Sequence, residues 1–114
     1  MISCGVDIIK IERIMKMEKN FHRLFTEKEM EYFHNLKNPY ESMAGTFAAK
    51  EAFAKTFQKG LEFINFQEIE VLHTDLHAPY FEFHGNTKKE IEGNHFALSI
   101  SHDGDYAIAY VIRY

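Results

Sequence analysis

Residues 41–60 constrain the fold more than any other segment. Their sequence, ESMAGTFAAKEAFAKTFQKG, is rich in Ala and Lys, which favour helix, and it follows Pro39. Gly60 closes the segment, and glycine commonly ends helices. Phe47 and Phe57 fall near one face of such a helix. We therefore expect one long helix whose apolar face packs against a second layer of structure.

A strand and two shorter helices are expected before this segment. The β-branched run at residues 4–11 predicts a strand. Apolar residues at helical spacing then indicate the first helix: Ile11, Ile14 and Met15, with Met17 and Phe21 extending the apolar surface. Thr26 and Glu29 form a capping-box pattern, which predicts a second helix over residues 26–36.

The second half of the chain is expected to form strands. Residues 66–73 alternate apolar and acidic side chains, and residues 79–84 follow after a loop. Residues 96–114 have the pattern of a hairpin around Asp103-Gly104, a favoured dipeptide for tight turns. We therefore predict one α+β domain, residues 1–114, in which an antiparallel β-sheet packs against one long and two shorter helices.

The closing strand is apolar on both faces. Its side chains alternate between Tyr106, Ile108, Tyr110 and Ile112 on one face and Ala107, Ala109 and Val111 on the other. Both faces are therefore expected to be covered, one by the helices of the chain and the other by a partner subunit. The alternative is a central strand enclosed entirely by its own chain.

Composition limits the class of protein. The chain has 114 residues, of which 46% are hydrophobic, as is ordinary for one globular domain. The formal net charge of −4 argues against a general nucleic-acid binder. No long uncharged apolar stretch occurs, so we expect neither a signal peptide nor a membrane span. The single cysteine, Cys4, cannot form an internal disulfide, which favours a cytoplasmic location.

Positive charge is concentrated in one place. Residues 10–28 carry six Lys and Arg against three Glu, on a protein that is acidic overall. Such a basic face suggests one specific anionic partner. The alternative is an ordinary solvated helix surface.

Several common catalytic sites are absent from the sequence. It contains no G-x-G-x-x-G, no G-x-x-x-x-G-K-[ST] and no G-x-S-x-G. Cys4 is interpreted as a small core residue and not as a nucleophile. His73 and His77 have ligand-like spacing, but they straddle an expected strand end, where such residues do not converge.

Three groups of residues could carry chemistry. Asp7 is the only charge between Met1 and Ile9; a buried carboxylate there needs a cation, hydrogen-bond donors or a sheet edge. Glu51 and Lys55 lie four apart on the long helix, although such pairs are also common structural ion pairs. The third group is the Ser-His pair at residues 101–102, near the expected hairpin turn, where a histidine is often only a surface residue.

Together these groups suggest transfer of a phosphate-containing group. Magnesium prefers one or two protein carboxylates and completes its coordination with waters and substrate phosphates. Asp7 and Glu51 could supply the carboxylates, with Lys55 and His102 available to meet phosphates.

The order of the motifs resembles a known family. G-V-D-I-I-x-I-x-R-I near the start, F-T-x-x-E, A-G-T-F-A-A-K-E-A-F-A-K and S-I-S-H-D occur in sequence. This pattern resembles the holo-acyl-carrier-protein synthases, the short bacterial type of 4′-phosphopantetheinyl transferase, and extends from Gly5 to about Ile112.

The resemblance implies a fold, a reaction and an assembly. The expected fold is that of the 4′-phosphopantetheinyl transferases. These enzymes move the phosphopantetheine arm of coenzyme A to a serine of apo-acyl carrier protein, releasing 3′,5′-ADP, in support of fatty acid biosynthesis. They need Mg²⁺, and the short type is a homotrimer with active sites between subunits.

The resemblance also assigns roles to residues of this chain. The metal carboxylates fall on Asp7 and Glu51. The lysine that contacts the phosphates of the coenzyme, and is a candidate proton donor to the leaving group, falls on Lys55. Independently of the resemblance, Glu51 or a metal-linked water could accept the proton of the attacking serine. The other coenzyme-binding positions are Gly60, Ser101 and His102. The basic segment that docks the acidic carrier protein falls on Arg13, Met17, Phe21 and Arg23.

Three positions depart from the pattern of the family. Thr46 stands where the family usually has Arg, and Gln58 and His77 each replace a glycine. These departures motivate an alternative, a weakly active or non-catalytic paralogue that binds carrier protein or coenzyme A. A third possibility is a plain α+β interaction domain without a metal.

Overall fold

The computed structural model describes residues 1–58 and 64–114. The strands are β1 (Ser3–Lys10), β2 (Ile69–His73), β3 (Pro79–Phe83), β4 (Phe96–Asp103) and β5 (Tyr106–Arg113). The helices are α1 (Ile11–Met15), α2 (Phe21–Leu24), α3 (Glu27–His34), α4 (Pro39–Lys55) and α5 (Gly85–Glu90), with short 3₁₀ turns η1 (Glu18–Asn20) and η3 (Phe66–Glu68). No helix in these ranges has the length and apolar character needed to cross a membrane.

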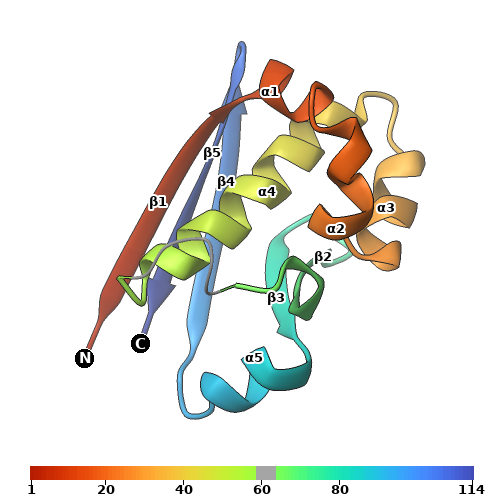
Figure 1. Ribbon diagram of the computed structural model, residues 1–114. Helices are drawn as coiled ribbons and strands as arrows, with labels where there is room; N and C mark the ends of the chain where they lie inside the picture. Colours follow the sequence, from red (N-terminus) through yellow and green to blue (C-terminus); the bar gives the residue numbers. More distant parts are fainter. Residues whose placement is uncertain (59–63) are drawn as a thin grey trace.

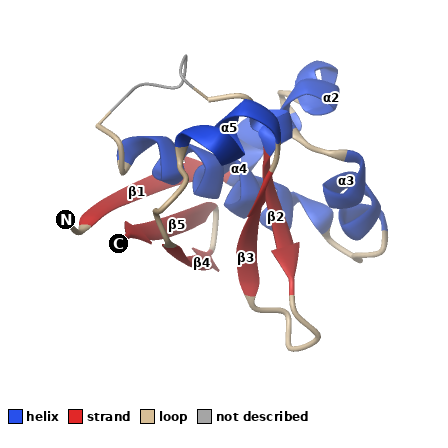
Figure 2. Cartoon of the chain, turned by 90° about the horizontal axis from the view of Figure 1, so that it is seen from below, coloured by secondary structure: helices blue, strands red, loops and turns tan. Residues whose placement is uncertain are grey.

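The strands form two antiparallel sheets. One has three strands in the order β1-β5-β4, and the other pairs β2 with β3. Both termini lie at the same end of the three-stranded sheet, and α4 crosses one of its faces (Figure 1). The pair β2–β3 stands beside that sheet (Figure 2). The predicted α+β class with antiparallel strands is confirmed, although the strands divide between two sheets.

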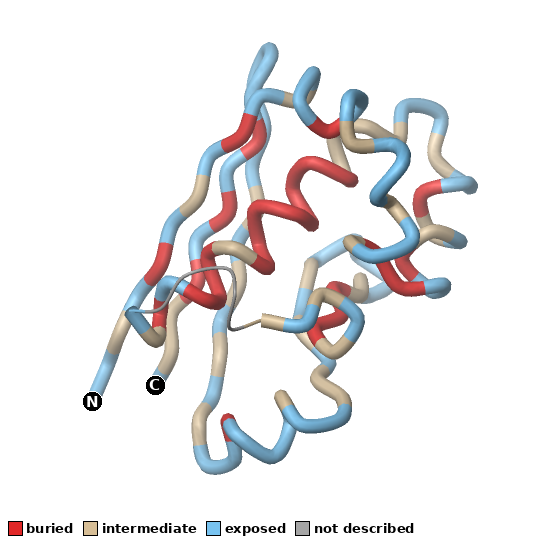
Figure 3. Tube along the Cα trace, viewed as in Figure 1, coloured by how far each residue is buried: buried red, intermediate tan, exposed pale blue. Residues whose placement is uncertain are grey.

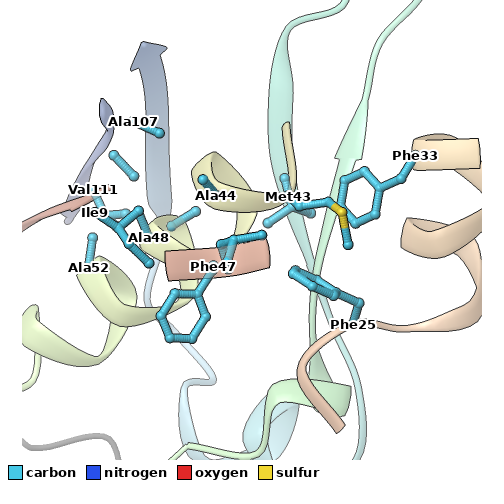
Figure 4. Close-up of a cluster of buried hydrophobic side chains, with 14 residues drawn as sticks. Ile9, Phe25, Phe33, Met43, Ala44, Phe47, Ala48, Ala52, Ala107 and Val111 are labelled. Atoms are coloured by element: carbon cyan, nitrogen blue, oxygen red, sulfur yellow. The ribbon is translucent and has the colours of Figure 1, made fainter. Parts of the chain in front are cut away.

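Helix α4 is the centre of the core. Small residues four apart, Ala44, Ala48 and Ala52, are completely buried and allow the strands to approach closely. The inward side chains of β5, Ala107, Ala109 and Val111, meet this face. Figure 3 shows the helix as the longest buried segment, and Figure 4 shows Ile9 and Val111 packed on one side of it and Phe25 and Phe33 on the other.

The predicted helix over residues 26–36 is present as α3. Thr26 Oγ1 accepts a hydrogen bond from the Glu29 amide, and Glu29 Oε1 accepts one from the Thr26 amide, which completes the capping box. The hairpin of β4 and β5 is also present, with Asp103 paired to Tyr106.

The first helix differs from the prediction. It is broken into α1, η1 and α2, because Met17 and Asn20 adopt non-helical dihedral angles. Helices of four or five residues have little stability of their own, so tertiary packing sets their geometry. Several apolar side chains of this segment turn toward the core, with Ile14 fully buried and Phe21 partly buried.

Two further differences concern helix ends. Helix α4 ends at Lys55, where the Thr56 hydroxyl bonds the carbonyl of Phe53, and the expected end at Gly60 lies outside the described residues. The sequence analysis missed α5, whose first turn is held by Glu68, a carboxylate that accepts hydrogen bonds from the Asn86 and Thr87 amides.

The outer face of the three-stranded sheet is apolar and exposed. Val6 and Ile8 of β1 are 48% and 58% exposed, and Ile108 and Tyr110 of β5 are 38% and 43% exposed. The alternation predicted for β5 is confirmed, with its alanines buried inside. Cys4 is also exposed, so its interpretation as a core residue is wrong.

We predict that Gly5→Ala destabilises the protein. A Cβ on Gly5 would lie 2.1 Å from the backbone oxygen of Ala52, so β1 and α4 would have to separate. Overpacking of this kind costs about 1–3 kcal/mol of unfolding free energy. Cys4→Ala, one residue earlier and exposed, is the control. Equal urea midpoints for the two variants would contradict the importance of this contact.

Candidate active site

Asp7 lies on the inner face of β1, opposite the last turns of α4. Its side chain is 12% exposed, and Oδ1 lies 3.1 Å from the ammonium of Lys55. Lys55 also donates a 2.9 Å hydrogen bond to the carbonyl of Val6. The lysine therefore pairs with Asp7, across the contact between β1 and α4, rather than forming the helical pair with Glu51 that the sequence allowed.

Glu51 lies one helical turn before Lys55 and faces the same carboxylate. Burial raises the pKa of Glu51 to about 8, and the adjacent, negatively charged Asp7 contributes in the same direction. The positive charges of Lys55 and Arg13 oppose this rise in pKa. Two carboxylates that share a site in this way disfavour each other's ionised form.

The donor set fits a hard divalent cation. Asp7 Oδ2 is buried and has no hydrogen-bond partner among the described residues. A cation between Asp7 and Glu51 would satisfy this oxygen and remove the repulsion between the carboxylates. The structure thus brings together three of the residues singled out in the sequence, Asp7, Glu51 and Lys55, from segments far apart in the chain.

Ser101 and His102 do not lie with Asp7, Glu51 and Lys55. Both are in β4, where successive side chains point to opposite faces. His102 Nδ1 lies 2.5 Å from Glu41 in the first turn of α4. Glu41 and Glu51 are ten residues apart, about 15 Å along a helix. The structure therefore places this histidine well away from Asp7 within one chain.

His102 lines a pocket of about 250 Å³. Thr46 and His77, two of the three departures from the family pattern, line the same pocket, together with Tyr32 and His73. The rings of Tyr32 and His73 stack with centroids 4.1 Å apart. Burial, and then the charge of His77, lower the pKa of His73.

The two substituted glycines retain a glycine-like backbone. Gln58 has φ = 57° and His77 has φ = 65°, the only positive values at non-glycine positions in the described ranges. These positions therefore keep the left-handed conformation that glycine adopts most easily. Gly60, a predicted coenzyme-binding residue, lies outside the described residues.

The four residues of the predicted docking segment differ in exposure. Arg13 in α1 and Arg23 in α2 are exposed, whereas Met17 and Phe21 are partly buried against the core. Arg13 is also near enough to Glu51 to influence its pKa. The basic segment therefore borders the carboxylate pair.

Two groups of charged side chains, one of them fully buried, were not predicted from the sequence. Lys50 and Glu29 form a 2.7 Å ion pair with 0% and 1% side-chain exposure, and the signal was a lysine inside the apolar run FAAKEAFA. Burial lowers the pKa of Lys50 and raises that of Glu29, while the partner charge opposes each shift.

Glu70, Glu82 and His84 form a second cluster, in which side-chain atoms that could bind a metal lie within 4.8 Å of one another. Both carboxylate oxygens of Glu70 already have hydrogen-bond partners, Thr26 and His84.

Known proteins are similar to this chain in both sequence and fold. A family model of the 4′-phosphopantetheinyl transferase superfamily matches residues 3–111. The holo-[acyl-carrier-protein] synthase of Caldanaerobacter subterraneus is 39% identical, with 97% of this chain and 93% of that protein covered. That of Carboxydothermus hydrogenoformans is 38% identical, with 100% and 98% covered.

Solved structures agree with these relatives. The holo-[acyl-carrier-protein] synthase of Neisseria meningitidis superposes with a TM-score of 0.89 and 32% identity, covering 100% of this chain and 99% of that one. The Bacillus anthracis enzyme, solved in complex with coenzyme A (3′,5′-ADP), gives a TM-score of 0.83 and 35% identity over 97% and 94% of the two chains. The resemblance seen in the sequence is confirmed: the chain belongs to the 4′-phosphopantetheinyl transferase superfamily.

Proposed function

We propose that this chain is a magnesium-dependent holo-acyl-carrier-protein synthase with its reaction centre at Asp7, Glu51 and Lys55. The enzyme transfers the 4′-phosphopantetheine arm of coenzyme A to a serine of apo-acyl carrier protein and releases 3′,5′-ADP, which serves fatty acid biosynthesis. The observation that carries the assignment of the centre is the paired carboxylates with a buried, unpartnered oxygen on Asp7. The lone Cys4 suits a reducing cytoplasm.

Each residue of the centre has a distinct role in this proposal. Asp7 and Glu51 would hold Mg²⁺, which when bound supplies positive charge at the diphosphate of coenzyme A. The Lys55 ammonium, held near Asp7, would neutralise charge on the departing 3′,5′-ADP. The attacking serine must lose its proton, and Glu51 or a water held at the site would accept it.

Replacing Asp7 with Ala should abolish transfer and leave the fold intact. The change removes one metal ligand and the ion pair with Lys55, but it also relieves the unfavourable interaction between the two carboxylates, so the melting temperature should change little. The measurement is the mass of apo-carrier protein incubated with coenzyme A, Mg²⁺ and enzyme. Asp75→Ala, in the exposed turn between β2 and β3, is the control.

Full transfer by Asp7→Ala would refute the metal assignment. If the native chain binds carrier protein but the mass of the carrier does not increase, the alternative of a weakly active or non-catalytic paralogue would be favoured instead.

The docking surface, which we define as Arg13, Met17, Phe21 and Arg23, would receive the acidic carrier protein. Two exposed guanidinium groups flank two partly buried apolar side chains. Such an arrangement supports charge-steered docking beside the carboxylate pair.

Charge reversal at Arg23 should weaken recognition of carrier protein. We expect Arg23→Glu to raise the KM for carrier protein about tenfold at low salt, less at high salt, and to leave the KM for coenzyme A unchanged. Lys37→Glu makes the same charge change at an exposed site between α3 and α4. Equal effects of Arg23→Glu on both substrates would argue against a docking role.

A homotrimer with shared active sites would explain two features. The outer sheet face carries exposed apolar residues on paired strands, including Val6 opposite Tyr110 and Ile8 opposite Ile108. An apolar patch of this kind is typical of an interface. Ser101 lies on this face, opposite Ile108, so a covering subunit would bring it near a neighbouring chain.

The separation of His102 from Asp7 supports the same proposal. Because the two lie near opposite ends of α4, one coenzyme molecule would draw its metal carboxylates from one chain and its histidine from the next. Closed cyclic symmetry would repeat this arrangement at each interface.

Light scattering should therefore report a trimer. Ile8→Glu, which places a charge on the outer sheet face, should yield monomers that have lost most of their transfer activity. Leu76→Glu, at a residue 90% exposed in the turn after β2, should remain trimeric and active. A native monomer that transfers at full rate would overturn both the assembly and the shared site.

A further inference from the structure

Lys50 is the one lysine of α4 that the proposed chemistry does not use. Its side chain is completely buried, and its ammonium donates hydrogen bonds to the carbonyl of Leu24 at 2.8 Å, to Glu29 Oε1 at 2.7 Å and to the carbonyl of Phe66 at 2.9 Å. An ammonium has three N–H donors, so all of them are satisfied. The residue therefore joins α4 to three other segments at one point.

Stability alone does not account for this lysine. A buried ion pair is often no more stabilising than apolar residues of similar volume, because both charges lose their hydration. Glu29, the partner, also accepts hydrogen bonds from the amides of Thr26 and Val71. Lys50 and Glu29 are thus both fixed by several hydrogen bonds, which points to a role in placing the bonded segments relative to α4.

One of the segments that Lys50 holds is α2. This helix has four residues, too few to be stable alone, and the carbonyls at its C-terminal end lack helical partners. Lys50 bonds the carbonyl of Leu24, and the amide group of Gln67 bonds the carbonyls of His22 and Phe25. Side chains from outside the helix therefore fix its end.

We propose that Lys50 is a positioning residue that holds the docking surface at a fixed place relative to Glu51. Leu24 directly follows Arg23, and Lys50 directly precedes Glu51 on the rigid α4 helix. The Lys50–Leu24 hydrogen bond thus connects the neighbour of a docking residue to the neighbour of a carboxylate. This inference rests on the proposed function, since it uses the roles assigned there to Arg23 and Glu51.

Loss of this bond should affect one substrate only. The docking residues on α2 would have to be ordered when the carrier protein binds, and that ordering weakens binding. Asp7 and Lys55 do not contact Lys50, so the coenzyme side of the site should be preserved. A residue that only stabilises the fold would instead lower the amount of active enzyme, which reduces the apparent kcat and leaves both KM values unchanged.

The test compares Lys50→Met/Glu29→Gln with Glu29→Gln. The double variant removes the lysine together with its carboxylate partner. The single variant keeps the donor to Leu24, with Glu70 as the remaining carboxylate near the Lys50 ammonium. We expect the double variant to raise the KM for carrier protein about five- to tenfold relative to the single variant, with the KM for coenzyme A unchanged. Ile91→Ala, which removes core volume near α5, controls for lost stability alone. Equal KM values for carrier protein in the single and double variants would overturn the proposal.

Arg23→Glu separates this proposal from the assignment of the docking surface. If Arg23→Glu raises the KM for carrier protein and the double variant does not, only the role of Lys50 is refuted. If neither does, the docking surface itself is wrongly assigned.

Hydrogen exchange tests the same idea in the native protein, whether or not the variants fold. The amide of Phe25, bonded to the carbonyl of Phe21 at 3.0 Å, should be protected to nearly the same degree as amides in the middle of α4. Exchange at the rate of an exposed loop would refute a fixed α2.

Discussion

The close contact between β1 and α4 determines where the reactive groups lie. Gly5 approaches the carbonyl of Ala52 so closely that no side chain fits between them. Asp7 follows Gly5 by two residues and therefore points to the same face of the strand. Glu51 precedes Ala52 on the helix, and Lys55 follows it by three. The carboxylates and the ammonium meet because the two backbones meet.

A different side of α4 carries the buried polar contacts of Lys50. Consecutive residues on a helix point about 100° apart, so Lys50 and Glu51 face different layers of the molecule. Glu51 faces β1, whereas Lys50 reaches Glu29 on α3 and the end of α2. One helix thus bonds to the strand that carries Asp7 and to the segment that carries the docking residues.

Local patterns predicted much of the fold. The capping box at Thr26 and the Asp103-Gly104 turn involve neighbours in sequence, and both are present. Helix α5 could not be predicted, because Glu68, which holds its first turn, comes from a distant segment. The break in the first helix likewise follows from packing around α4.

Only part of the candidate site was predicted from the sequence. The residue pattern singled out Asp7, Glu51 and Lys55, the family resemblance assigned their roles, and the structure brings them together. Ser101 and His102 were treated as one group, although the period of two in a strand already places them on opposite faces. Lys50 was not predicted, because the only local signal was a charge in an apolar run and its partners come from distant segments.

The face of α4 that is lined by alanines restricts which substitutions the helix can accept. Ala44, Ala48 and Ala52 are in full contact with other residues, so a larger side chain at any of them would lift the helix from the sheet. Such a shift would alter the distance between Asp7 and Glu51 as well as the packing. A saturation scan of this helix would therefore find that activity tolerates fewer substitutions at its smallest residues than at partly exposed positions such as Ser42 in its first turns.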